Sequence, residues 1–201
     1  MAPSSCIELS TPERALLLEI ARKSVHSGLD SSISLKLSQQ DVPQALRIAR
    51  AVFVTLNHRG RLRGCIGSLE ASQPLANAVA QSAFSAAFRD PRFAPLQAYE
   101  LDDISIEISV LYGMEPLPAS SRGELLAALQ PERDGLLLQE GQRRATFLPQ
   151  VWRQLPDPEV FLDHLLTKAG LPIGYWSHSL TSFRYQTLAI SEAASAPPYS
   201  V

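Results

Sequence analysis

Cysteine is scarce in this sequence, and long apolar runs are absent from it. Cys6 and Cys65 are the only cysteines among 201 residues, too few for a disulfide framework, so we expect two free thiols. No segment approaches the roughly 18 consecutive apolar residues of a membrane span. Residues 1–13 lack the basic segment and apolar run of a secretory signal. These absences predict a cytoplasmic protein that makes no contact with a membrane.

An excess of positive charge is also missing. Lys and Arg number 18 against 20 Asp and Glu, which gives a formal net charge of -2 and a pI near 6.1. A protein held on nucleic acid mainly through phosphate contacts needs a broad basic surface. We therefore expect no strong bulk affinity for nucleic acid, and any anion site must be local. With 45% hydrophobic residues, the chain can bury a full globular core.

The motifs of several common enzyme classes are absent as well. The chain has no Walker A sequence, no Gly-x-Gly-x-x-Gly that opens a helix and no Gly-x-Ser-x-Gly elbow. Its four histidines show none of the short paired spacings of zinc sites, and there is no Cys-x-x-Cys. We predict neither a metal site nor a bound cofactor.

The most informative segment that is present is residues 59–67, Arg-Gly-Arg-Leu-Arg-Gly-Cys-Ile-Gly. It follows the β-branched and aromatic run 51–56 across turn residues, which predicts a β-hairpin. In a regular second strand, Arg61, Arg63 and Cys65 share one face. Nearby cations favour the thiolate, the nucleophilic form of cysteine. This pattern favours Cys65 as a nucleophile beside an anion site.

The two glycines of this segment, Gly64 and Gly67, leave the backbone bare, as the close approach of a ligand requires. A structural interpretation stands beside the functional one. Free cysteine is often buried, and glycine in a strand often marks a bulge. A bulge at Gly64 would shift the alternation and separate Cys65 from its arginines.

Three further residues are candidates for the same site. Asp90 and Arg92 in the sequence Asp-Pro-Arg-Phe are candidate substrate-binding residues, although an Asp that ends a helix and pairs with an Arg is often structural. Glu107 alternates with apolar residues on a predicted strand. It would be a general base if it were buried near Cys65, and a solvated carboxylate on an open sheet face.

Periodicity predicts an α+β fold with a mostly antiparallel sheet and packed helices in two lobes. A capping box at residues 10–13 starts a helix that ends near Gly28. The remaining predicted elements are a helix from 75 to before 90, a strand over 104–111, a hairpin over 135–147, a helix over 157–170 and a strand over 181–189. We assign 8–190 to one domain and 191–201 to a flexible tail rich in Ala, Ser and Pro.

Leu62-Arg63-Gly64-Cys65-Ile66-Gly67 resembles the six-residue signature of the AMMECR domain family, whose bacterial members are called AmmeMemoRadiSam system protein A. The resemblance continues, in the family's order and at compatible spacing, through 90–93 (Asp-Pro-Arg-Phe), 106–111, 147–151 and 168–171. It implies an α+β fold of two lobes and kinship with nucleotide-binding folds. It also implies a gene partnership with a Memo-like protein and a radical S-adenosylmethionine enzyme, and no established reaction.

Two hypotheses from different classes follow. In the first, the protein is an enzyme in which Cys65 is the nucleophile or redox thiol, Arg61 or Arg63 holds an anionic group, and Glu107 or Asp90 assists proton transfer. Its substrate would be nucleotide-like or a modified base. In the second, the protein is a non-catalytic module that binds the Memo-like protein, the radical enzyme or a small molecule.

Overall fold

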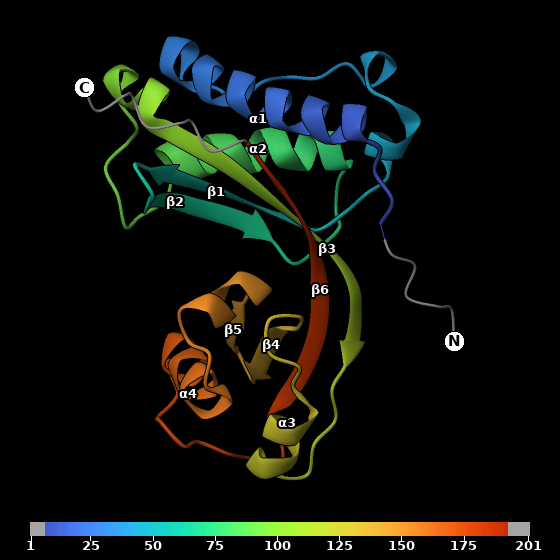
Figure 1. The fold of residues 1–201 in the computed structure, drawn as a ribbon, viewed down its shortest axis with the longest axis vertical. Helices are drawn as coiled ribbons and strands as arrows, with labels where there is room; N and C mark the ends of the chain where they lie inside the picture. Colours follow the sequence, from blue (N-terminus) through green and yellow to red (C-terminus); the bar gives the residue numbers. More distant parts are fainter. Residues whose placement is uncertain (1–6, 193–201) are drawn as a thin grey trace, which may run out of the picture. The chain divides into compact units, whose positions relative to one another are not determined.

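Residues 7–192 are described by a computed structural model in which helices and strands alternate along the chain (Figure 1). The strands are β1 (Val52–His58), β2 (Arg61–Ser68), β3 (Ile104–Pro116), β4 (Gly135–Glu140), β5 (Arg143–Phe147) and β6 (Thr181–Ser191). The α-helices are α1 (Thr11–Ser31), α2 (Leu75–Phe88), α3 (Arg122–Ala128) and α4 (Pro158–Lys168). Short 3-10 turns cover Gln39–Asp41, Gln44–Arg47, Ala98–Asp103 and Pro149–Arg153.

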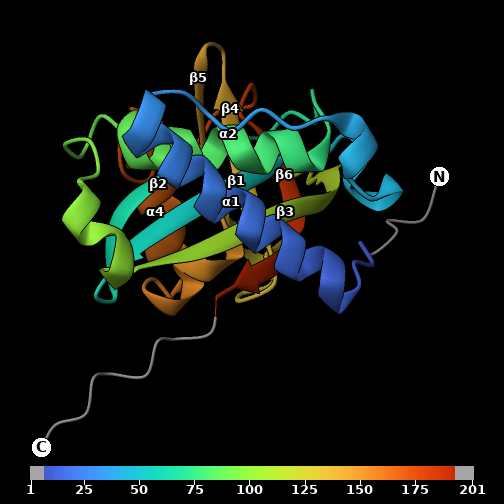
Figure 2. The same ribbon diagram turned by 90° about the horizontal axis from the view of Figure 1, so that it is seen from above.

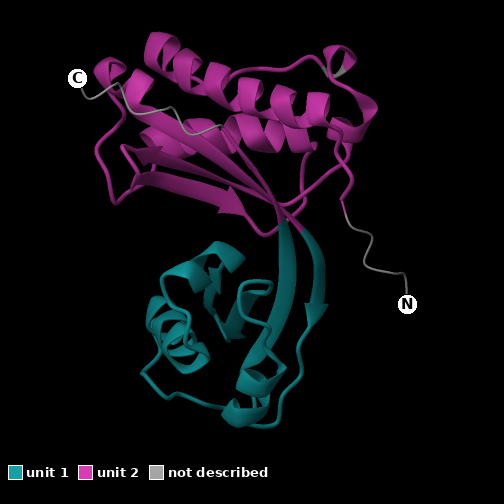
Figure 3. Ribbon diagram, viewed as in Figure 1, with its two compact units in different colours: residues 1–6, 112–187 teal, residues 7–111, 188–201 magenta. Residues whose placement is uncertain are grey.

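The strands are hydrogen-bonded in the order β2-β1-β3-β6-β4-β5, and β1 and β4 pair antiparallel with both of their neighbours. The α+β class with an antiparallel sheet is therefore confirmed. The chain divides into two compact units, coloured separately in Figure 3. Among the described residues, unit 1 comprises 112–187, and unit 2 comprises 7–111 and 188–192. Assignment of 8–190 to one domain stays a prediction.

Unit 2 is layered, with α1 and α2 on one face of β1, β2 and β3 (Figures 1 and 2). The apolar residues that alternate along β1 and β3 point to this face and are fully buried, among them Val54, Leu56 and Ile108. Arg59 and Gly60, with φ values of 50° and 77°, form the two-residue turn of the predicted β1–β2 hairpin. The other face of these strands carries the more polar, half-buried residues.

Helix α1 begins as predicted and ends later than predicted. The hydroxyl of Ser10 accepts a hydrogen bond from the Glu13 amide at 3.4 Å, and the Glu13 carboxylate accepts one from the Ser10 amide at 2.7 Å, which completes the capping box. The helix continues through Gly28 to Ser31. Gly28 lies inside the helix, and glycine is required there because a Cβ would come within 2.1 Å of the Phe88 ring on α2. The glycine permits close helix packing and is not a stop signal.

Unit 1 is built around the β4–β5 hairpin, with α4 packed against β5. Its core contains leucines from α3, α4 and β4 together with Trp152 and Phe161. The rings of these two aromatic residues stack at 3.7 Å between centroids, and the Trp152 indole N–H donates to the Asp134 carbonyl at 2.7 Å. The indole is therefore fully buried with its polar atom satisfied.

The C-terminal boundary differs from the prediction by two residues. Ser191 ends β6, and the Glu192 carboxylate accepts hydrogen bonds from the Ile106 amide and from the Arg22 guanidinium. The rest of the predicted flexible tail, 193–201, lies outside the described residues, as does Cys6. Within 7–192, no helix combines the length and the apolar character that crossing a membrane demands.

Substitution Gly28→Ala tests the packing of α1 on α2. The added methyl group meets the Phe84 and Phe88 rings, so we expect a loss of about 1–3 kcal/mol in the free energy of unfolding, measured with urea. The control is Gly123→Ala in α3, where the added Cβ would lie 4.0 Å from the Ser121 hydroxyl. Alanine there should be neutral or stabilise by up to about 1 kcal/mol. Equal gains at both positions would contradict the close packing.

Candidate functional site

Cys65 lies on the face of the unit 2 sheet opposite α2. Thr55 of β1 pairs with Cys65 of β2 on one side and with Glu107 of β3 on the other. Directly paired residues point to the same face of a sheet, so the three side chains form a row. The Thr55 hydroxyl donates a hydrogen bond to the Cys65 sulfur at 3.3 Å. Cys65 is a free, half-buried thiol, which is neither the deep core nor an open surface.

The predicted cationic face of β2 is wrong, because a β-bulge interrupts the register. Leu56 pairs with Gly64 and Asn57 pairs with Leu62, which leaves Arg63 as the extra residue. Leu62 therefore shares the face of Cys65. Arg61 pairs with His58, which puts it on the opposite face, where it is exposed at the end of the hairpin. The bulge lies at Arg63, one residue before Gly64, where the sequence analysis had considered one.

Arg63 forms a partly buried ion pair with Glu100 of the 3-10 turn before β3. Its Nε and Nη2 donate to the two carboxylate oxygens at 2.7 and 3.0 Å, and the side chains are 13% and 10% exposed. The pair raises the pKa of Arg63 and lowers the pKa of Glu100, in each case mainly through the hydrogen bonds. The guanidinium also lies 5.9 Å from the centroid of the Phe93 ring. This arrangement ties the turn to β2.

Asp90 and Arg92 hold the free edge of β2 at Cys65. The Asp90 carboxylate accepts a hydrogen bond from the Cys65 amide at 2.8 Å, and Arg92 Nη2 donates to the Cys65 carbonyl at 3.4 Å. Arg92 Nε and Nη2 also bind the carboxylate, at 2.9 and 2.6 Å. Because β2 ends the strand order, these two side chains take the place of a neighbouring strand.

The two members of this pair differ in exposure. Asp90 is 4% exposed, whereas the Arg92 side chain is 52% exposed. The hydrogen bond from Arg92, assisted by the Cys65 amide, lowers the pKa of Asp90 to about 2. Asp90 therefore positions the backbone of Cys65, and only Arg92 presents part of its surface to a ligand.

Contacts within the protein explain why residues 64 and 67 are glycines without a side chain. A Cβ on Gly64 would lie 2.1 Å from the carbonyl oxygen of Ala86 in α2. A Cβ on Gly67 would lie 2.2 Å from the Val52 carbonyl oxygen of β1 and 2.6 Å from the Phe53 ring. Gly64 thus allows α2 to approach the sheet, and Gly67 allows the Phe53 ring to lie across β2.

Glu107 is half-buried and lies two strands away from Cys65. Neighbouring strands are about 4.8 Å apart, so the two backbones are separated by roughly 10 Å. Thr55 lies between them in the row. The sequence analysis did not identify Thr55, because only the register of three strands shows that it lies between the thiol and the carboxylate.

No group of three or more His, Cys, Asp or Glu side chains in 7–192 is arranged to hold a metal ion. The groups on or beside the face that carries Cys65 are a half-buried thiol, a hydroxyl, a carboxylate and a guanidinium. These are the groups of nucleophilic and acid–base catalysis.

The comparisons with known proteins agree with the fold class, helices packed on a curled antiparallel sheet. The chain belongs to the AMMECR1 family, whose model matches residues 18–190. It is 43% identical to a protein of Methanothermobacter thermautotrophicus over 82% of this chain and 85% of the relative. A Thermofilum pendens protein is 39% identical over 89% of each. The crystal structure of an uncharacterized Pyrococcus horikoshii protein matches with a TM-score of 0.84 and 30% identity, over 90% of this chain and 92% of that one.

The depressed pKa of Asp90 predicts a specific dependence of stability on pH. Its stabilising effect is complete above the unfolded-state value of 3.8 and is lost as the pH falls towards about 2. The free-energy difference between wild type and Asp90→Asn should therefore shrink by about 2 kcal/mol between pH 6 and pH 2. Chemical denaturation measures it, with the exposed Asp41→Asn as the control. A difference independent of pH would contradict the ion pair.

Proposed function

We propose that this protein is a thiol-dependent enzyme in which Cys65 is the nucleophile and the substrate is an anionic, nucleotide-like molecule or modified base. The observation that carries the proposal is the hydrogen bond of 3.3 Å between the Thr55 hydroxyl and the Cys65 sulfur. It lies within the row formed by Cys65, Thr55 and Glu107. Activated cysteines need a neighbouring group that accepts their proton, and this row supplies one.

The proton of the thiol leaves through Thr55. A hydroxyl has one donor and two acceptor sites, so once its proton turns from the sulfur towards Glu107, Thr55 can accept the proton of Cys65 while it passes its own to that carboxylate. The sulfur then uses its electron pair to bond to an electrophilic carbon of the substrate. The group displaced from that carbon leaves with the bonding electrons and takes up the proton from Glu107. Where that carbon is a carbonyl carbon, the adduct is a thioester, which water hydrolyses to the acid and the restored thiol.

Arg92 is the residue that we assign to the anionic part of the substrate. Its Nε and Nη2 bind Asp90, which fixes the guanidinium beside Cys65 and leaves Nη1 for the substrate. The side chain is half-exposed. Arg63 suits this role less well because its side chain is only 13% exposed, and Arg61 points to the other face. An arginine whose guanidinium has N–H groups left to donate is a common partner of carboxylate and phosphate groups.

Phe53 supports the choice of a planar substrate. It occupies the same sheet face as Thr55, two residues away, and its ring lies across Gly67. The side chain is half-buried, so part of the ring remains accessible. Aromatic rings beside a cationic group are a common surface for stacked bases.

Substitutions at Cys65 and Thr55 test the proposal in a strain from which the gene has been deleted. Cys65→Ser should unfold at the same temperature as wild type and fail to complement the strain. Thr55→Val removes the hydroxyl with little change in shape and should lower function at least about a hundredfold. Thr55→Ser keeps the hydroxyl and is the matched control. Full complementation by Cys65→Ser would remove the nucleophile.

The alternative, a binding module for a Memo-like protein and a radical S-adenosylmethionine enzyme, has one specific observation in its favour. Leu62 and Tyr99 of unit 2 are large apolar residues with 45% and 82% of their surfaces exposed. Leu62 belongs to the edge strand β2, and exposed apolar residues at a sheet edge favour association with a partner.

Affinity purification from native extract distinguishes the binding-module hypothesis from the enzyme hypothesis. Under the module hypothesis, wild type retains one or both of these partners and Leu62→Ser with Tyr99→Ser loses them, whereas Cys65→Ser behaves like wild type. If no partner co-purifies under gentle conditions, the enzyme hypothesis is favoured.

A further inference from the structure

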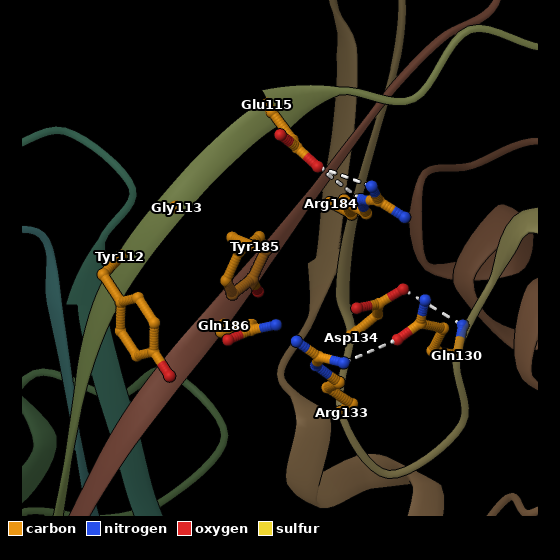
Figure 4. A pocket seen from close by; sticks show the side chains of 9 residues that line it. All are labelled: Tyr112, Gly113, Glu115, Gln130, Arg133, Asp134, Arg184, Tyr185 and Gln186. Atoms are coloured by element: carbon orange, nitrogen blue, oxygen red, sulfur yellow. Dashed lines mark hydrogen bonds and ion pairs between the residues drawn. The ribbon is translucent and has the colours of Figure 1, made fainter. Parts of the chain in front are cut away.

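Unit 1 contains a pocket that the proposed reaction at Cys65 does not use. It has a volume of about 370 Å³, within the range of small-molecule sites. Three segments of unit 1 meet there: the end of β3, the turn before β4 and the middle of β6 (Figure 4). The lining residues are Tyr112, Gly113, Glu115, Gln130, Arg133, Asp134, Arg184, Tyr185 and Gln186.

Arg133 brings a fixed positive charge to this pocket. Its Nη1 donates to the Gln130 amide oxygen at 3.1 Å. In the orientation that satisfies both groups of its amide, Gln186 accepts from Arg133 Nε at 2.7 Å and Nη2 at 3.3 Å, and donates to the Tyr112 hydroxyl at 3.1 Å. These partners of Arg133 are neutral amides. These hydrogen bonds hold the guanidinium in place without pairing it to a carboxylate.

Asp134 brings a negative charge beside it. The residue is only 2% exposed, and one carboxylate oxygen accepts from the Gln130 amide at 3.0 Å. The second oxygen points towards Tyr185 and Gln186, and the residue lines the pocket (Figure 4). Each oxygen of a carboxylate can accept more than one hydrogen bond, so this oxygen can accept a donor from a ligand.

The remaining walls contribute no net charge. Arg184 Nε and Nη2 bind the Glu115 carboxylate at 2.7 and 2.6 Å, which neutralises both side chains. The Tyr185 ring lies against Gly135, and its hydroxyl contacts the Thr146 hydroxyl and the Phe147 carbonyl. Burial raises the pKa of Tyr185, so the phenol stays neutral. The charges left to a ligand are those of Arg133 and Asp134.

We infer that this pocket binds a free α-amino acid. The carboxylate of the ligand meets Arg133, and its ammonium group donates to the second oxygen of Asp134. An α-amino acid carries these two groups on one carbon, and consecutive residues of the chain supply their partners side by side. The volume leaves room for a large side chain, against the Tyr185 ring and the Arg184–Glu115 pair.

Isothermal titration calorimetry of the full chain against the twenty standard α-amino acids tests this inference. We expect at least one of them to bind, and its N-acetyl and carboxamide derivatives to bind at least about tenfold more weakly, since each lacks one charge. Arg133→Gln and Asp134→Asn should each weaken binding of the parent amino acid by about the same factor. The exposed Arg153→Gln of the same unit is the control and should bind like wild type.

Three results would overturn the inference. They are no binding of any amino acid at millimolar concentration, equal binding of the N-acetyl derivative, and unchanged affinity in Arg133→Gln, which changes an exposed residue. The test is independent of the proposed reaction, because Cys65→Ser should retain the amino-acid affinity of wild type.

Discussion

The candidate site depends on one buried carboxylate. Asp90 follows the end of α2, yet it accepts a hydrogen bond from the Cys65 amide in the edge strand β2 and is bound by the Arg92 guanidinium. An edge strand has no neighbour to fix its outer backbone groups, so Asp90 and Arg92 together fix them at the residue that carries the thiol. The position of Cys65 beside Thr55 follows from this contact and from the register with β1.

Close approach of α2 to its neighbours is the second constraint. Gly28 on α1 leaves space for the Phe84 and Phe88 rings, and Gly64 on β2 leaves space for the Ala86 carbonyl. Gly64 inside the signature-like segment thus allows the helix layer to pack closely against one face of the sheet. The other face keeps its half-buried polar residues, and the proposed chemistry belongs to that face. Packing and candidate function therefore use opposite sides of the same strands.

Local patterns predicted much of the fold. The β-branched run before Arg59-Gly60 predicted the hairpin, and Ser10 with Glu13 predicted the start of α1, because both signals act over a few residues. Gly28 was misinterpreted as a helix end, since its reason is a contact with α2. Gly64 indicated a possible bulge, which the register places at Arg63. The place of Thr55 and the pocket of unit 1 could not be predicted, because each depends on register or on segments distant in sequence.

The central claim is that Cys65 is an accessible, activatable thiol and not a packing residue. The most direct measurement is the rate of iodoacetamide alkylation of Cys65 in the native protein against pH, read by peptide mass spectrometry. Cys6, the only other cysteine of the chain, is the internal reference. The account predicts alkylation of Cys65 without denaturant, at a rate that changes in Thr55→Val and is kept in Thr55→Ser. Alkylation of Cys65 only after denaturation would contradict the account.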